Sequence, residues 1–328
     1  MKEKFLGCMV GLAIGDALGA PVEFMSLDEI KRKYGQQGIR GFDSWGGFPP
    51  GAYTDDTQMS LATAEGCIRA QLRWLDRGIC HLPSVVHARY MDWLKTQDDS
   101  FQRRAPGNTC LQALRNHKMG TIEEKINNSK GCGGVMRTAP LGLVVEAGKA
   151  FRYGAECAAI THGHPSGYLT AGFLSELICH LTAGKSLIDA IEISTDELTS
   201  YEDHQESLDI IQKAQGLAKS DKPVQVAIKM LGGGGVGEEA LAISLYCSLK
   251  FTDDWLGGTL AAVNHSGDSD STGSITGAIL GTMNGLKEIP VSLIERLENQ
   301  GQIKKLTDDM YKLFVEGKKL SHEEYPPC

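Results

Sequence analysis

Apolar residues recur at helical spacing along most of the chain. Phe5, Met9, Leu12 and Ala13 fall on one face of a helix that ends near 15–16. The same periodicity predicts helices over 59–75, 82–95, 167–183, 186–198, 206–218, 238–249, 255–263 and 274–286. Almost no stretch alternates apolar and polar residues with period two, so strands should be scarce. The pattern therefore predicts an all-α protein.

The chain shows no obvious point of division into domains. No linker rich in Pro, Ser or Gly interrupts it, and no repeat in the solenoid range occurs. The segment 34–53 is rich in glycine and aromatic residues and is long for a loop in a compact domain, which is typical of a functional loop. We expect a single domain over 1–328.

Composition narrows the class of protein. The 328 residues are 41% apolar and 23% charged, which suits a folded core, and the net charge of -8 disfavours nucleic acid as a partner. No uninterrupted apolar run of 18 residues occurs, and the N-terminus lacks a hydrophobic signal core, so we expect no membrane association. The nine cysteines are scattered without a CxxC pair, which favours free thiols and a cytoplasmic location.

Two short acidic runs, more than two hundred residues apart, carry the strongest chemical signal. They are Tyr53-Thr54-Asp55-Asp56-Thr57 and the segment SGDSDSTG at 266–273. Carboxylate and hydroxyl oxygens are the ligands that hard divalent cations such as Mg²⁺ and Mn²⁺ prefer. Each run taken alone also fits a helix N-cap or a polar turn. A metal site requires the fold to bring the two runs together.

Four further segments accompany the acidic runs. The segment 11–24 ends a helix with glycines and presents Glu23 on the loop that follows. The turn at 131–137 is rich in glycine and opens a helix, so its backbone N–H groups could face a phosphate. His162 and His164 lie at a helix entrance, and a glycine-rich stretch occupies 232–237.

These six segments, in this order, resemble the ADP-ribosylglycohydrolase family of the dinitrogenase-reductase-activating type. The matching patterns are GxxxGDALGxPxE, YTDDTQM, GCGGVMR, THxHP, GGG…EEAL and HSGDSDSTG, and they span about 5–285. The resemblance implies a compact all-α fold with a binuclear Mg²⁺ centre in a cleft, or Mn²⁺ as the alternative cation.

The resemblance also assigns roles to individual positions. The implied metal ligands are Thr54, Asp55, Asp56, Asp268, Asp270 and Ser271. The implied binding residues for the ADP-ribose diphosphate are Ser129, Gly131, Cys132, Gly133 and Gly134, with His162 reaching toward the ribose or a phosphate. Some family branches have Asn at the position of Cys132 and Thr at that of Ser271. Glu23 matches a loop glutamate that gates the metals and takes a catalytic part in some members.

The implied reaction suits these residue types. Hydrolysis at the anomeric carbon of ribose passes through an oxocarbenium-like state, which paired carboxylates commonly serve. Two cations can bind ribose hydroxyls and lower the pKa of a bridging water. The candidate catalytic carboxylates are Glu23, Asp55, Asp56 and Asp268, and the sequence leaves the acid and the base unassigned.

We expect a metal-dependent hydrolase that removes ADP-ribose from a modified protein, with arginine as the favoured attachment site, and so reverses a transferase or toxin. Three alternatives stay open at this point. One is an ADP-ribose-binding or toxin-blocking immunity protein with little catalysis. The others are a structural protein built on the same fold and a hydrolase of a phosphoester bond.

Several neighbouring residues have two interpretations. We expect Asp16 to brace the first acidic run and Arg137 to brace the glycine turn by ion pairing, with a phosphate contact as the alternative. Glu238 suits a helix N-terminus or a substrate contact. The loop at 102–108 contains two arginines. It is either a solvated surface loop without a binding role or a loop that steers phosphate. Many relatives have a bulky aromatic in the segment 232–237, where this chain has Gly235, so a wider substrate mouth is expected.

Overall fold

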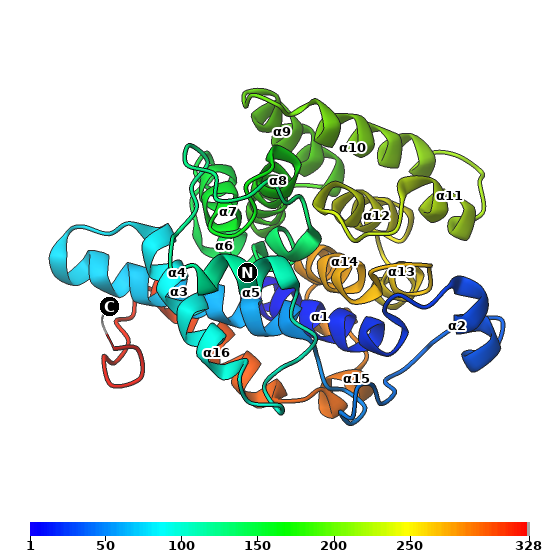
Figure 1. Ribbon diagram of the computed structural model, residues 1–328, viewed down its shortest axis with the longest axis horizontal. Helices are drawn as coiled ribbons and strands as arrows, with labels where there is room; N and C mark the ends of the chain where they lie inside the picture. Colours follow the sequence, from blue (N-terminus) through cyan, green and yellow to red (C-terminus); the bar gives the residue numbers. More distant parts are fainter. Residues whose placement is uncertain (327–328) are drawn as a thin grey trace.

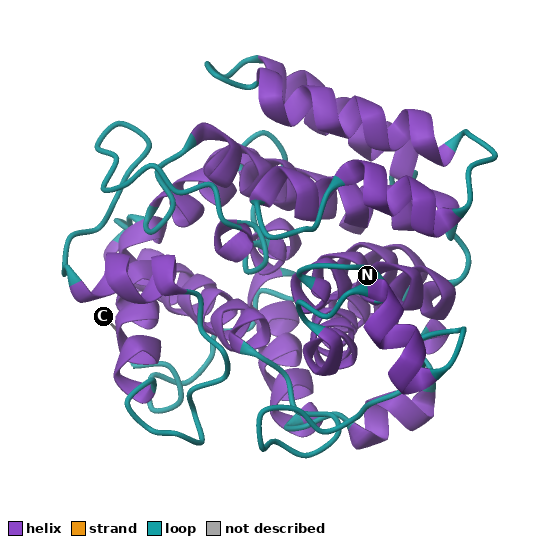
Figure 2. Cartoon of the chain, turned by 45° about the vertical axis from the view of Figure 1, so that its right-hand side comes forward, coloured by secondary structure: helices purple, strands orange, loops and turns teal. Residues whose placement is uncertain are grey.

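The computed structural model describes residues 1–326, and the last two residues of the predicted domain, Pro327 and Cys328, lie outside the described residues. Over this range the chain consists of helices joined by loops (Figure 2). The only β pairing among these residues is two isolated bridges, Trp45 with Phe48 and Gly131 with Val236. The prediction of an all-α protein is confirmed.

Sixteen α-helices make up the described chain (Figure 1). They are α1 (Lys2–Gly19), α2 (Leu27–Tyr34), α3 (Asp55–Arg77), α4 (Leu82–Thr96), α5 (Asn108–Arg115), α6 (Ala139–Val144), α7 (Ala150–Ala159), α8 (Pro165–Thr182), α9 (Leu187–Thr199), α10 (Gln205–Ala218), α11 (Val224–Leu231), α12 (Gly237–Lys250), α13 (Trp255–Val263), α14 (Ser269–Asn284), α15 (Val291–Arg296) and α16 (Gln300–Phe314). Short 3₁₀ turns occupy Ala20–Val22, Cys132–Gly134 and Leu286–Glu288. Every predicted helical range overlaps one of these helices.

Helices α1 and α14 form the centre of the fold and lie side by side in Figure 1. Glycines line the contact, so the two backbones touch. A Cβ on Gly11 would lie 2.3 Å from the carbonyl oxygen of Gly277, and one on Gly15 would lie 2.0 Å from that of Gly273. Glycine is therefore required at both positions. This contact sets the C-terminal end of α1 beside the N-terminal end of α14, where the second acidic run begins.

The apolar character of α1 reflects its place in the core. Lys2–Val22 is long and apolar enough to cross a membrane by length and composition alone, with a mean hydropathy of 1.7. That segment is nevertheless buried inside the molecule. The surrounding apolar core draws on residues from Phe5 to Tyr325. Seven cysteines of the described part are free thiols: Cys8, Cys67, Cys110, Cys132, Cys157, Cys179 and Cys247.

Candidate metal and ligand site

The loop after α1 carries Glu23 and is tied to the second acidic run. The Phe24 backbone N–H donates to the Gly267 carbonyl oxygen at 2.7 Å. Phe24 has a φ of 56°, in the left-handed region that non-glycine residues seldom adopt, and its ring is 70% exposed. The hydrogen bond and the unusual backbone angle together fix the loop at the position from which Glu23 reaches the start of α14.

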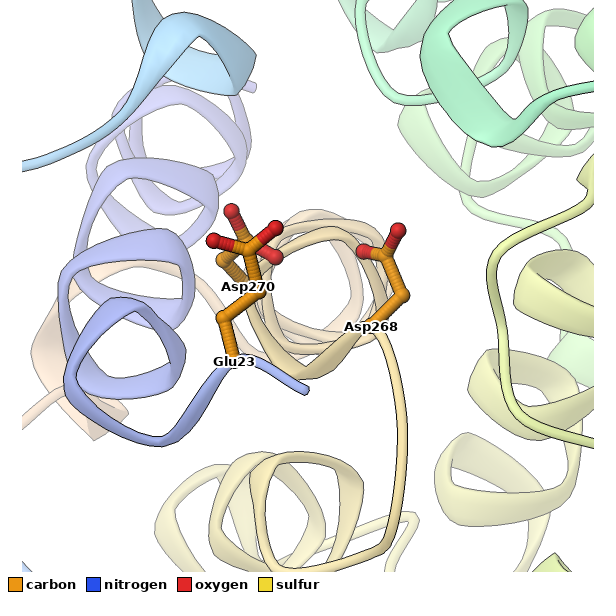
Figure 3. A group of neighbouring side chains, drawn as sticks. All are labelled: Glu23, Asp268 and Asp270. Atoms are coloured by element: carbon orange, nitrogen blue, oxygen red, sulfur yellow. The ribbon is translucent and has the colours of Figure 1, made fainter. Parts of the chain in front are cut away.

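Glu23, Asp268 and Asp270 converge at this point. Each offers a carboxylate oxygen, and these oxygens lie within 4.8 Å of one another. Figure 3 shows Glu23 reaching over from the loop after α1 toward Asp268 and Asp270 at the beginning of α14. Asp55 and Asp56 line the same cavity as these three residues. The two acidic runs therefore meet, as the metal-site hypothesis requires.

Buried hydrogen bonds set the position of the first acidic run. Thr54 is the N-cap of α3, and its hydroxyl accepts from the Asp56 N–H at 3.2 Å. The fully buried carboxylate of Asp16 accepts from the Thr54 N–H at 2.9 Å, from the Thr57 N–H at 3.0 Å and from the Thr57 hydroxyl at 2.5 Å. The expected bracing role of Asp16 is confirmed. The Gly107 N–H donates to Asp55 Oδ2 at 3.4 Å.

Burial and mutual repulsion raise the pKa values of four clustered carboxylates. Burial, followed by the negative charges of Asp268 and Asp16, raises the pKa of Glu23 to about 8. Burial and the neighbouring carboxylates likewise hold the pKa values of Asp55, Asp56 and Asp270 well above the usual range. The charged groups that act on these four residues are other acids, so no positive charge among them compensates the ionised forms.

The donor set fits a divalent cation. Asp56 Oδ2 and Asp268 Oδ1 are buried and accept no hydrogen bond from residues 1–326. Buried carboxylate oxygens without a partner are costly unless a cation or a proton neutralises them. An all-oxygen set of clustered carboxylates is the environment that Mg²⁺ and Mn²⁺ favour.

The two glycine-rich segments pair with each other beside the acidic cluster. Gly131 and Val236 form an antiparallel bridge, and the Cys132 N–H donates to the Gly235 carbonyl at 3.3 Å. The Gly233 carbonyl in turn accepts from the Asp268 N–H at 2.8 Å. These bonds connect the glycine turn, the segment 232–237 and the second acidic run into one framework. The Cys132 amide, expected to face a phosphate, is therefore already bonded within the protein.

A cavity of about 360 Å³ joins the acidic cluster to the glycine turn. Of the predicted site residues, those that line it are Glu23, Asp55, Asp56, Gly131, Cys132, Gly133, His162, Asp268, Asp270 and Ser271. Thr54, Ser129 and Gly134 are not among the residues that line it. The cavity is also lined by 105–108, from the loop that had two interpretations, and by Phe24, Thr109, Cys110 and Met136, which were not among the predicted site residues. The Gly107 and Asn108 pair before an apolar run was a detectable helix-start signal, but nothing in it indicated a cavity.

Cys132 contacts the acidic cluster without the character of a nucleophile. Its thiol donates to Asp268 Oδ2 at 3.1 Å, and the Ser271 hydroxyl lies 3.6 Å from its sulfur. Burial and the charges of Asp268 and Asp56 hold the pKa of the Cys132 thiol well above its usual range. The thiol therefore stays protonated and is a poor nucleophile.

The prediction that Arg137 braces the turn through an ion pair is wrong. Among residues 1–326 Arg137 forms no ion pair, and its guanidinium lies in the core, 4.3 Å from the centre of the Tyr90 ring. The brace comes instead from Lys130, which pairs with Glu238 and, at 2.6 Å, with Glu206. The ion pair with Lys130 gives Glu238 a structural role, so a substrate contact is not needed to explain this residue.

Arg104 also has a structural role. Its guanidinium forms two hydrogen bonds to the Glu298 carboxylate, at 2.9 and 3.0 Å, and its carbonyl accepts from the Asp55 N–H at 2.9 Å. The side chain is buried and points away from solvent. Arg104 therefore anchors the loop that lines the cavity, and the hypothesis that it steers phosphate is not supported by its contacts.

These features define an all-α protein whose central cavity has an acidic wall and a glycine-rich wall. The sequence model of the ADP-ribosylglycohydrolase family matches residues 1–319, so the chain belongs to this family of hydrolases that act on ADP-ribosyl linkages.

Named relatives and a solved structure agree with the assignment. The chain is 27% identical over 303 residues to the ADP-ribosyl-[dinitrogen reductase] glycohydrolase of Rhodospirillum rubrum, covering 91% of each protein. It is 25% identical over 320 residues to the ADP-ribosylarginine hydrolase Tri1 of Serratia proteamaculans, covering 94% of this chain and 79% of that protein. A solved ADP-ribosylglycohydrolase-related protein complex has the same fold, with a TM-score of 0.72 and 24% identity over 96% of this chain and 99% of that one.

Proposed function

We propose that this protein hydrolyses the bond between ADP-ribose and an arginine side chain of a modified protein, using two Mg²⁺ ions or, alternatively, two Mn²⁺ ions. The observation that carries the proposal is the single cavity bounded by the carboxylate cluster on one wall and the glycine turn on the other. The first suits a cation centre and a reacting ribose, and the second leaves room for a diphosphate beside the backbone. ADP-ribose contains both a ribose that could react at the first wall and a diphosphate that could lie along the second.

The residues that would hold the cations are Thr54, Asp55, Asp56, Asp268, Asp270 and Ser271. When bound, such ions bind ribose hydroxyls and lower the pKa of a water at the site. The buried, uncompensated carboxylates support this assignment because a cation would relieve their mutual repulsion. Asp16 and the N-cap hydroxyl of Thr54 fix the first run, so its carboxylates need little rearrangement to serve as ligands.

Glu23 is the candidate proton carrier of the cluster. It lies on the loop after α1 beside Asp268 and Asp270, and burial together with the neighbouring negative charges raises its pKa to about 8 before a cation binds. When it carries a proton, Glu23 can protonate a leaving guanidine nitrogen, whereas an aspartate that cation binding keeps ionised can accept a proton from water. Asp55 and Asp56 remain the candidates for the second task.

The relatives and the composition support a target and a cellular setting. The name of the Serratia proteamaculans relative, an ADP-ribosylarginine hydrolase, supports arginine, and that of the Rhodospirillum rubrum relative supports a protein as the substrate. The net charge of -8 supports a partner other than nucleic acid. Scattered free thiols support a cytoplasmic location without a membrane.

The test is release of free ADP-ribose from an ADP-ribosyl-arginine protein, followed by chromatography, with Mg²⁺, with Mn²⁺ and with chelator. Release with a cation and none with chelator is the expected result. Parallel assays use substrates with ADP-ribose linked through serine or through a nucleic acid base. Release from one of these alone would show that the reaction is hydrolysis but the linkage is not to arginine. Binding of ADP-ribose without release from any of the three would contradict hydrolysis and favour the binding-protein alternative.

A further inference from the structure

Arg137 is a buried cation that the proposed function does not use. Its side chain has no exposed surface, and its guanidinium is held by neutral groups. Nη2 donates to Thr161 Oγ1 at 2.6 Å and to the Cys157 carbonyl at 3.2 Å, and Nη1 lies 3.5 Å from Cys110 Sγ. Burying a charge among neutral partners is costly, so the arrangement calls for a purpose beyond packing.

Thr161 connects Arg137 to His162. Thr161 Oγ1 lies 2.8 Å from His162 Nδ1, and both residues are buried. A guanidinium has no acceptor, so Arg137 must be the donor to the Thr161 oxygen. The hydroxyl keeps one hydrogen to donate. Nδ1 with a lone pair accepts it well, whereas the alternative acceptor, the Cys110 thiol, is weak and stays protonated because burial raises its pKa to about 11.

His162 is neutral in this setting. Burial, together with the positive charge of Arg137, lowers the pKa of His162 to about 3. A neutral imidazole carries its hydrogen on one nitrogen only, and the hydrogen bond made by the other nitrogen decides which one. If Nδ1 accepts from Thr161, then Nε2 carries the hydrogen.

The Nε2 edge of the ring faces the glycine turn. A Cβ on Gly133 would lie 3.3 Å from His162 Nε2, and one on Gly131 would lie 3.4 Å from it. His162 lines the cavity together with both glycines. A hydrogen on Nε2 is therefore available at the wall where the diphosphate of ADP-ribose would lie.

We propose that Arg137 and Thr161 are positioning residues that hold His162 as the Nε2–H tautomer, so that it donates a hydrogen bond to a phosphate oxygen of ADP-ribose. This inference rests on the proposed function, because that function supplies the ligand. Arg137 acts at a distance through the Thr161 hydroxyl. Neither of these two residues needs to touch the ligand.

The first experiment reads the tautomer directly and needs no substrate. Histidine labelled with ¹⁵N in the full-length chain gives long-range ¹H–¹⁵N spectra in which the two neutral tautomers differ, and His162→Gln identifies the His162 signals. Wild type is expected to show a protonated Nε2 and an unprotonated Nδ1. A protonated Nδ1 would overturn the proposal.

The second experiment links the tautomer to ligand binding. Thr161→Val removes the hydroxyl and keeps the shape, and is expected to mix the tautomers and weaken calorimetric binding of both ADP-ribose and ADP about tenfold, as for one lost hydrogen bond. Thr161→Ser restores the hydroxyl and is expected to recover both properties. Arg137→Lys keeps the positive charge but removes the guanidinium that donates to both Thr161 and Cys157. It is expected to mix the tautomers and weaken binding as Thr161→Val does.

The outcomes are separable from those of the hydrolysis assay. A Thr161→Val protein that mixes tautomers yet binds ADP-ribose and ADP like wild type would overturn the donor role, as would wild type that binds neither ligand. Unchanged spectra and affinity in Arg137→Lys would overturn the role of Arg137. A wild-type protein that binds ADP-ribose through the fixed tautomer without hydrolysing any linkage would uphold the inference while the proposed function fails.

Discussion

Gly15 and Gly273 touch backbone to backbone across α1 and α14: a Cβ on Gly15 would lie 2.0 Å from the Gly273 carbonyl oxygen, and one on Gly273 would lie 2.5 Å from the Gly15 oxygen. Because α1 leads to Glu23 and α14 begins with the second acidic run, the spacing of these two helices sets the spacing of the carboxylates. The glycines therefore contribute to the site as well as to the core.

Gly15→Ala should destabilise the protein by about 1–3 kcal/mol, because the methyl group must push the two helices apart. Gly216→Ala on α10 is the matched control. Its Cβ meets no atom within 4 Å, and alanine favours a helix. Thermal denaturation of both variants checks the prediction, and a Gly15→Ala melting temperature equal to that of Gly216→Ala would contradict it.

Asp16→Asn should loosen the first acidic run. The amide NH₂ replaces an oxygen that accepts from the Thr57 N–H and hydroxyl. The hydroxyl can turn and accept from the amide, but the buried N–H loses its partner, at a cost of about 1–3 kcal/mol. Asp196→Asn, at an exposed position of α9, makes the same change in charge. Melting temperature and Mn²⁺ affinity should both fall in Asp16→Asn alone. Equal affinity in the two variants would contradict a role for Asp16 in arranging the ligands.

The stability of the protein should fall with acid partly through His162. Its folded-state pKa, about 3, lies below the unfolded value near 6.5, so only the unfolded chain binds a proton between these values. Stability from this group is thus complete above pH 6.5 and is lost as pH falls toward 3. In chelator, wild type should lose stability relative to His162→Gln between pH 7.5 and pH 5. A constant difference in melting temperature across this range would contradict the burial of a neutral imidazole.

Gly235 should set the width of the cavity mouth. It lines the cavity, and a Cβ there meets no atom within 4 Å, so Gly235→Ala should leave stability and hydrolysis close to those of wild type. Gly235→Trp should narrow the mouth and raise KM for an ADP-ribosylated protein more than for free ADP-ribosyl-arginine. Steady-state kinetics with the two substrates measures the difference, and an equal change in both KM values would contradict a gating position.

Much of the fold could be predicted from periodicity, and the misses have physical reasons. Helices α6 and α15 are six residues each, too short to show a periodic pattern. Helix α16 does carry a helical signal in the sequence, because Ile303, Met310 and Leu313 recur at helical spacing and are all buried. The start of α14 was placed too late because Ser269 and Asp270 suggest a turn, yet they form its first turn.

The candidate site was predictable where residue type alone carries the chemistry. The two acidic runs and the turn at 131–134 have recognisable compositions. Arg137 was misplaced because a sequence does not show that an arginine turns inward onto Tyr90 and Thr161. Phe24 was missed as a cavity residue because its placement depends on a positive φ and on the Gly267 carbonyl, which is remote in sequence.

The central claim is that two acidic runs form one cation centre that serves the hydrolysis of an ADP-ribosyl bond. Its most direct test counts Mn²⁺ ions bound at equilibrium and measures ADP-ribose release in wild type, Asp56→Asn and Asp268→Asn. Two ions per chain and cation-dependent release are expected in wild type, with fewer ions and loss of release in each variant while the melting transition remains cooperative. Full Mn²⁺ binding and full release in both variants would contradict it.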